Sequence, residues 1–166
     1  MKKLGNIEVL VLVAAVFVVA ALISTIQGQA TKPTHSTDPE KAVLARLEEI
    51  QSAAQGLDPD KVFSMVLEND KGALVQNGRL FLTRKEALDS TKQGFQGLQK
   101  VEYKFDQQQV TMLSPSIALA VGEGSSSATT LDGRSFQTPF AQSVVMILTN
   151  GEWKVLHAHR SFRPAK

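Results

Sequence analysis

The chain of 166 residues has a length typical of one domain, a formal net charge of +2 and no cysteine. The lack of cysteine excludes disulfides, thiol nucleophiles and thiolate metal sites. Lysine and arginine are scattered along the sequence, so it lacks the basic footprint of a nucleic-acid-binding protein.

The N-terminus has the pattern of an export signal. Two lysines, Lys2 and Lys3, precede an unbroken apolar run from Val9 to Ile23, and small residues follow up to Ala30. This pattern predicts a signal peptide over residues 1–30 that is cleaved after Ala30. The protein is then periplasmic or secreted.

A second interpretation of the same segment is a retained anchor. The apolar run is long for a signal peptide, and residues 7–26 together approach the length that spans a bilayer. In that case the protein is held in the inner membrane and the rest of the chain faces outward. Residues 31–37 are polar and aperiodic and are predicted to form a linker, and the folded domain is expected over residues 38–166.

Two helix start signals open the folded part. Asp38-Pro39 predicts a helix that ends at Gly56, with the glycine in the left-handed position that terminates many helices. Asp58-Pro59 repeats the signal and predicts a shorter second helix. Asp58 and Asp60 together resemble a metal-binding pair, but helix capping and the helix dipole account for both, and we expect no metal there.

A hairpin and a third helix follow. The runs Ala73–Gln76 and Arg79–Leu82 flank Asn77-Gly78, a strong signal for a two-residue β-turn. Thr83 and Glu86 have the spacing of a capping box, which predicts a helix that continues through Phe95.

From Leu98 the apolar residues alternate, which predicts long strands. The apolar phase shifts after Gln107 to Gln109, which predicts a β-bulge that bends the sheet. Small residues from Ala118 to Gly122 either leave space above the sheet or allow close helix packing, and both interpretations are open. The stretch from Gly124 to Thr130 is predicted to be the solvated tip of a long hairpin.

The last hairpin is built around Asn150-Gly151. Because Val144 to Leu148 is apolar at every position, we expect a central strand that is covered on both faces. The final strand alternates, and strict alternation divides its side chains between two faces. One face is expected to carry Trp153, Val155, His157, His159 and Ser161, and the other Lys154, Leu156, Ala158, Arg160 and Phe162. Runs of helices followed by runs of strands indicate an α+β fold, with helices on one face of a curved antiparallel sheet.

Several short motifs follow one another along the chain: Leu57-Asp58, Asn69-Asp70, Arg84-Lys85-Glu86-Ala87, and Asn150-Gly151-Glu152-Trp153-Lys154-Val155 followed by His157-Ala158-His159-Arg160-Ser161. With these motifs the chain from about Glu40 to Phe162 resembles the nuclear transport factor 2-like superfamily, in particular its SnoaL-like branch. The last motif is especially similar to the end of the association domain of calcium/calmodulin-dependent protein kinase.

The resemblance implies a cone-shaped, cystatin-like α+β barrel with a pocket between the sheet and three N-terminal helices. It also implies a homodimer formed through the sheet, but no single activity, because a fold does not fix a function. In the kinase association domain, the arginine that matches Arg160 lines the pocket with other arginines. Here the matching neighbourhood carries Val144 and Ala118 to Ala120 instead, which argues against anion binding of that kind.

Arg160 is the first candidate for ligand binding. If it points into the cone it is a buried cation, which needs an acidic partner or an anionic ligand. The alternative is a residue at the rim, paired with Glu123 or Asp70.

His157 and His159 form a second candidate pair, on one strand face. A zinc site needs at least a third ligand, which no segment clearly supplies, so we expect no metal and favour an interface or sheet-face pair. Trp153 on the same face suggests that a second subunit covers it.

Asp70 and Tyr103 are the other candidates for chemistry. Enzymes of the superfamily often use a pocket Asp or His as general base, but Lys71 beside Asp70 favours a charged, exposed carboxylate. Tyr103 either donates a hydrogen bond inside the pocket or fills it. The sequence has no Gly-rich phosphate loop or other cofactor motif, and we expect no cofactor.

Three functions remain open at this point. The favoured one is an exported, non-enzymatic dimer that binds a small ligand or a protein partner in its cone. The second is an isomerase, cyclase or dehydratase that uses Asp70, His157 or His159 as base and Tyr103 or Arg160 to polarise an oxygen. The third is a structural subunit whose cone is fully packed.

Overall fold

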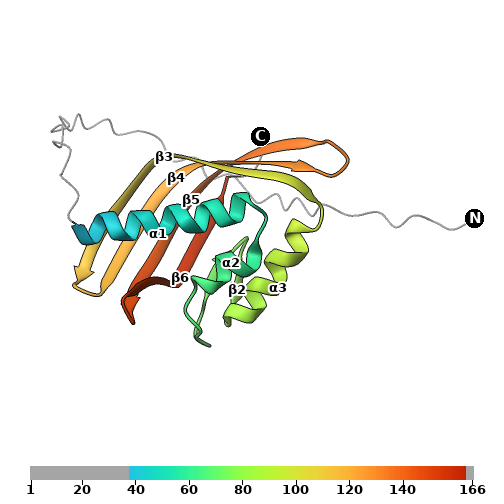
Figure 1. Cartoon of the computed structure of the whole chain (residues 1–166). Helices are drawn as coiled ribbons and strands as arrows, with labels where there is room; N and C mark the ends of the chain where they lie inside the picture. Colours follow the sequence, from blue (N-terminus) through green and yellow to red (C-terminus); the bar gives the residue numbers. More distant parts are fainter. Residues whose placement is uncertain (1–37, 164–166) are drawn as a thin grey trace, which may run out of the picture. The chain divides into compact units, whose positions relative to one another are not determined.

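A computed structural model describes residues 38–163, in which three helices precede most of a six-stranded sheet (Figure 1). The predicted signal peptide, anchor and linker lie outside the described residues. Within residues 38–163 the structure contains no helix long and apolar enough to span a membrane. The elements are α1 (Asp38–Gln55), α2 (Pro59–Ser64), β1 (Leu74–Gln76), β2 (Arg79–Phe81), α3 (Arg84–Phe95), β3 (Leu98–Ser114), β4 (Ile117–Thr130), β5 (Ser135–Thr149) and β6 (Glu152–Phe162).

The predicted α+β class is confirmed. The strand order is β2-β1-β6-β5-β4-β3, and the curved sheet stays open because its two outer strands do not pair (Figure 1). All neighbouring strands are antiparallel except β1 and β6, which run parallel. This parallel pair brings the short β1–β2 hairpin beside the end of the chain.

Local chemistry at the helix ends follows the sequence signals, with one difference. The Asp58 carboxylate accepts from the backbone N–H of Lys61, and Thr83 and Glu86 form the predicted capping box. At the end of α1, however, the left-handed residue is Leu57 and not Gly56. The N–H of Asp58 bonds to the carbonyl of Ala53, which sets the helix-ending motif one residue later than predicted.

Register shifts between neighbouring strands shape the sheet, and two of them bear on the sequence predictions. The predicted bulge in β3 is present, because the register with β4 shifts between Phe105 and Gln107. A second shift lies in β6, where Val145 pairs with His157 and Met146 pairs with Val155. Leu156 is therefore the extra residue of a bulge that the sequence analysis missed.

The bulge at Leu156 reverses the predicted faces at the start of β6. Trp153 and Val155 are buried in the main core cluster, on the same side of the sheet as Ala158, which packs against that cluster. The prediction that Trp153 shares a face with His157 and opposes Arg160 is therefore wrong. Trp153 faces the helices, and it gives no reason to expect a second subunit over it.

The core lies between the sheet and helices α1 to α3 (Figure 1). Ala118 and Ala120 are 0% and 1% exposed in this core, so helix packing, not empty space, occupies this part of the small-residue face. The main cluster comprises Val43, Leu47, Phe63, Val66, Phe81, Ala87, Ala118, Ala120, Val144, Met146, Trp153 and Val155.

Two predictions about β4 and β5 need correction. Val144 and Met146 are buried, but Val145 and Ile147 on the opposite face are only half-buried and Leu148 is 37% exposed. In the single chain, β5 is thus buried on one face only, at Val144 and Met146, and that face becomes exposed again at Leu148. The segment from Gly124 to Thr130 is also not a solvated tip, because it forms the second half of β4 and is buried or half-buried throughout.

Candidate functional site

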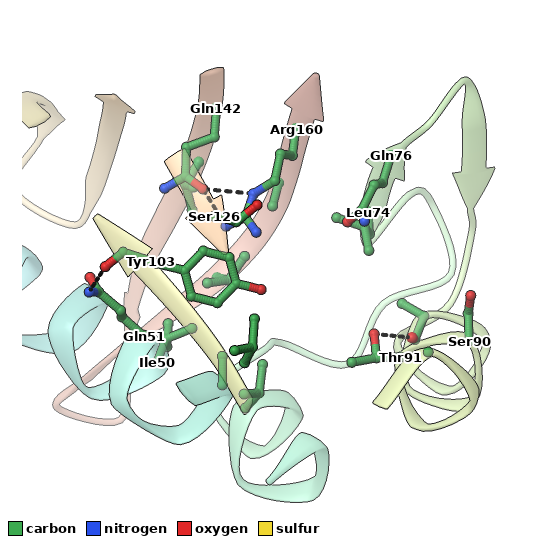
Figure 2. Close-up of a pocket in the computed structure, with 18 of the residues that line it drawn as sticks. Ile50, Gln51, Leu74, Gln76, Ser90, Thr91, Tyr103, Ser126, Gln142 and Arg160 are labelled. Carbon is green, nitrogen blue, oxygen red and sulfur yellow. Dashed lines mark hydrogen bonds between the residues drawn. The ribbon is translucent and has the colours of Figure 1, made fainter. Parts of the chain in front are cut away.

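A pocket of about 800 Å³ opens between the concave sheet and the helices (Figure 2). Its lining comes from all three helices and all six strands, so the whole domain contributes to it. Most of the lining is apolar, and polar side chains gather at a few points, as is usual for small-molecule sites. The apolar lining includes Ile50, Phe63, Val66, Leu74, Phe81 and Phe95.

Arg160 lies in the pocket wall beside Gln142 (Figure 2). Its Nε and one terminal nitrogen donate to the Gln142 Oε1 at 3.2 and 2.6 Å. Its guanidinium carbon lies 5.0 Å from the Tyr103 ring centroid and 4.8 Å from that of Phe140. Among residues 38–163, Arg160 takes part in none of the ion pairs. Two aromatic rings and an amide therefore hold the cation. The N–H groups of Arg160 that do not bond to Gln142 are available to a ligand.

The structure thus decides the orientation of Arg160. It is a half-buried pocket residue. Neither predicted rim partner meets it, because Glu123 accepts a hydrogen bond from Gln107 and Asp70 is exposed outside the pocket.

Tyr103 is fixed in the pocket wall through its backbone. It lies on β3, the edge strand, whose outer N–H and C=O groups have no strand partner. Two side chains of α1, Gln51 and Gln55, lie one turn apart and bond to the backbone of Tyr103 in place of a neighbouring strand. The Gln51 side chain donates to the Tyr103 carbonyl at 3.0 Å, and the Gln55 Oε1 accepts from the Tyr103 N–H at 2.9 Å. Figure 2 shows the Tyr103 ring directed into the cavity beside Arg160.

A polar row crosses four strands at this wall. Gln142 on β5 pairs with Arg160 on β6, Arg160 pairs with Gln76 on β1, and Gln76 pairs with Arg79 on β2. All four line the pocket, and we call them the Arg–Gln row. Figure 2 shows Gln142, Arg160 and Gln76 following one another across the sheet.

The Arg–Gln row corrects the predicted surroundings of Arg160. Val144 pairs with Ala158 and not with Arg160, so the apolar neighbourhood expected from the resemblance belongs to another position. The row contains a second arginine, Arg79. It belongs to the β1–β2 hairpin and not to the strands beside β6 that the resemblance pointed to.

The two histidines lie in different surroundings. The His157 Nδ1 is 2.8 Å from the Gly72 carbonyl oxygen, and the residue is not part of the pocket lining. His159 is exposed and contributes to the lining. Within residues 38–163 no group of three or more His, Asp or Glu side chains is placed to hold a metal ion.

The Asn69-Asp70 motif has a structural role in this chain. The Asn69 side chain donates to the carbonyl of Leu156 at 3.2 Å and accepts from the Lys71 N–H at 3.0 Å. It therefore supports the β6 bulge, while Asp70 points to solvent. Of the candidates named from the sequence, the pocket brings together Arg160, Tyr103 and His159, and it leaves out Asp70 and His157.

Titratable groups with a shifted pKa lie away from the pocket. The Thr130 hydroxyl, with help from Arg134, holds the pKa of the Asp132 carboxyl below its ordinary value, and Asp89 raises the pKa of Lys85. Both groups are exposed, and neither lines the pocket. Among the residues that line it, none is Asp or Glu.

Sequence reasoning missed Gln142, Gln76 and Arg79. A signal for Gln142 was available, because it has the same phase as Phe140, Val144 and Met146 and is the one polar residue in that stretch of apolar positions. Gln76 and Arg79 had no such signal, because their place depends on the pairing of β1 with the distant strand β6.

A family model matches most of the chain. The model, described as SnoaL-like domain, matches residues 43–165. No curated protein sequence matches significantly.

Solved structures with the same fold are numerous. A nuclear transport factor 2-like superfamily protein from Salmonella enterica serovar Typhimurium is 16% identical, with a TM-score of 0.68 over 76% of this chain and 91% of that one. A dehydratase candidate from Streptomyces avermitilis is 15% identical, with a TM-score of 0.67 over 75% and 96%. A candidate calcium/calmodulin-dependent protein kinase II association domain from Xanthomonas campestris is 17% identical, with a TM-score of 0.66 over 75% and 87%. At these identities the likeness establishes the fold alone.

Proposed function

The chain belongs to the SnoaL-like domain family, and from that premise we propose that it is an exported, non-enzymatic module that binds a small molecule in its pocket and forms homodimers. One observation carries the binding role. The pocket of about 800 Å³ has a largely apolar lining and a localised polar wall, yet no carboxylate lines it. Such a cavity suits the capture of a small molecule, whereas a general base of the Asp or Glu type has no place in it.

An enzyme that works by proton transfer is the second candidate. It is favoured by Arg160 and Tyr103, which lie together in the pocket and can polarise a substrate oxygen, and by the fold shared with a dehydratase candidate. Turnover of a hydroxy-ketone, lost in Tyr103→Phe while binding persists, would support this alternative. Binding without turnover by either protein supports the module.

Filling the pocket should abolish ligand binding. Ser126 lies opposite Tyr103 on β4 and lines the cavity, so Ser126→Trp places a large ring beside Arg160. We expect Nile red, a neutral apolar dye, to bind the wild-type chain and to lose at least about tenfold in affinity in this variant. A loss of that size corresponds to about 1.4 kcal/mol. Fluorescence titration measures both.

The matched control for this experiment is Ser125→Trp. Ser125 is the neighbouring residue on β4, and its side chain points to the other face of the sheet. It does not line the pocket of about 800 Å³. Dye binding should persist in that variant. Equal binding by both variants would mean that the dye occupies another surface and that the pocket is not the ligand site.

The homodimer is proposed through the outer face of the sheet. Ile117 and Leu119 on β4 pair with Ile147 and Val145 on β5, opposite the core-facing residues of both strands. These four side chains are only half-buried and form an apolar patch. A two-fold symmetric contact can cover the same patch on both copies at once, which removes it from water.

A charge at the centre of this patch should separate the dimer. Val145 stands between Leu119 and His157, so Val145→Glu puts a carboxylate into the proposed interface, where the contact would remove its water. We expect size-exclusion chromatography with light scattering to report a dimer for the wild type and a monomer for Val145→Glu. Gln137→Glu, at an exposed position near the hairpin tip, should remain dimeric. A dimeric Val145→Glu would place the interface elsewhere.

Export is proposed from the N-terminal sequence alone. Lys2, Lys3 and the apolar run from Val9 to Ile23 support it. A mature chain that begins after Ala30 would indicate cleavage, and a chain that keeps residues 1–30 in the membrane fraction would indicate an anchor.

A further inference from the structure

We infer that the ligand of this pocket is an organic anion with an apolar body, specifically a carboxylate whose head binds the Arg–Gln row and whose body lies in the apolar interior. This rests on the proposed function, that the pocket binds a small molecule. It adds the chemical class of that molecule and the residues that select it.

The charge of the Arg–Gln row is the first argument. Arg160 and Arg79 contribute two cations, and no Asp or Glu is among the residues that line the pocket. Neither arginine belongs to an ion pair within residues 38–163. Arg79 lies over the Phe81 ring at 4.6 Å, as Arg160 lies over Tyr103 and Phe140. The wall is therefore positive and uncompensated, and an anion is the ligand that it stabilises.

The free hydrogen-bond donors are the second argument. A guanidinium has five N–H groups, and Gln142 accepts from two of the Arg160 nitrogens through one oxygen. Because that oxygen accepts, the Gln142 amide group is left as a donor. The planar donor set that remains matches the two oxygens of a carboxylate, which arginine binds more strongly than it binds a neutral acceptor.

The position of Arg160 is the third argument. It is half-buried, and its guanidinium is held against two aromatic rings and an amide. A cation that is partly removed from water gains from an anionic partner that the protein itself does not supply. Gln76, its neighbour on β1, extends the polar wall toward Arg79.

The rest of the cavity defines the body of the ligand. Away from the Arg–Gln row, the lining contains Ile50, Phe63, Val66, Leu74 and Phe95. Figure 2 shows Leu74, Ser90 and Thr91 across the cavity from Arg160 and Tyr103. An aliphatic or aromatic body buried there contributes by the apolar area that it removes from water. Small, fully polar anions lack this contribution.

The test compares carboxylates with their neutral isosteres. Butanoate, 4-phenylbutanoate and decanoate, each paired with its primary amide, are titrated into the full chain by isothermal calorimetry at neutral pH and low salt. We expect 4-phenylbutanoate or decanoate to bind at least about tenfold more tightly than its amide, with butanoate weaker than both. The factor corresponds to replacing a charge-assisted hydrogen bond by a neutral one.

Variants then assign the selectivity to residues. In Arg160→Gln the acid and its amide should bind about equally, and Arg79→Gln should reduce the preference only by roughly threefold because Arg79 is exposed. Arg163→Gln is the matched control, since Arg163 is on the same chain end but does not line the pocket. It should keep the full preference.

Each outcome supports or overturns the inference. Equal affinity of acids and amides for the wild type overturns the carboxylate class but leaves the binding function intact. If the chain binds Nile red but none of the acids or amides, the carboxylate inference is also overturned. If the chain binds neither Nile red nor any of these compounds, the proposed binding function itself is overturned. A preference that persists in Arg160→Gln overturns the assignment to the row. If Arg160→Gln does not fold, the comparison of acids with amides on the wild type and on Arg79→Gln still tests the carboxylate preference.

Discussion

Replacing Trp153 by alanine is expected to lower the free energy of unfolding by about 3–5 kcal/mol. Trp153 is 7% exposed and belongs to the core cluster that includes Val43 and Leu47 of α1. Removing its ring leaves a cavity where the last strand meets the first helix, and the surrounding side chains can only partly fill it. The bulge at Leu156 places Trp153 on this face of the sheet.

Chemical denaturation followed by circular dichroism measures the Trp153→Ala effect. The control is Lys154→Ala, which removes the side chain of the next residue on the opposite face and should change stability by less than about 0.5 kcal/mol. If Trp153→Ala left stability unchanged but dissociated the dimer, the ring would lie on the outer face, as strict alternation along β6 predicts, and the structural account of β6 would be wrong.

A side chain at Gly124 is expected to destabilise the fold by about 3 kcal/mol. Gly124 is buried on β4, opposite Phe105 and next to the bulge in β3. A Cβ atom there would overlap the carbonyl oxygen of Lys104 and lie 2.9 Å from the Cα of Phe105. The obstacle is backbone, so no rotation of a side chain can relieve it, and Gly124→Val must separate β3 from β4 locally.

Gly94→Ala is the matched control for Gly124→Val. Gly94 lies within α3, and a Cβ atom there meets nothing within 4 Å. Alanine favours the helix over glycine by about 1 kcal/mol, so this variant should be slightly stabilised. Thermal unfolding of both variants tests the pair. A Gly124→Val protein as stable as wild type would mean that β3 and β4 do not approach as closely as the structure shows.

Signals that act within a few residues were readable in the sequence. The Asn77-Gly78 turn, the capping box at Thr83 and the N-cap at Asp58 all formed as predicted, because each depends on groups only a few residues apart. The β3 bulge was also readable, since the apolar phase changes on either side of it. The end of α1 differed by one residue because Leu57 adopts the left-handed conformation that glycine usually takes.

Features set by distant pairing were not readable. The bulge at Leu156 exists because β6 pairs with β5 while its edge residues bond to Asn69 and to the chain near Met65. No residue around it marks the change, and strict alternation therefore gave the wrong face for Trp153. The candidate site shows the same limit: Arg160 and Tyr103 were named from the sequence, whereas Gln76 and Arg79 enter the site only through the parallel pairing of β1 with β6.

Native mass spectrometry of the protein purified from the exported compartment tests most directly whether the pocket holds a small molecule. We expect a dimer whose subunits begin after Ala30 and carry a small carboxylic acid, which is absent from the Ser126→Trp protein. A wild-type protein that never carries an adduct, or an adduct retained in full by Ser126→Trp, would contradict ligand binding in the pocket.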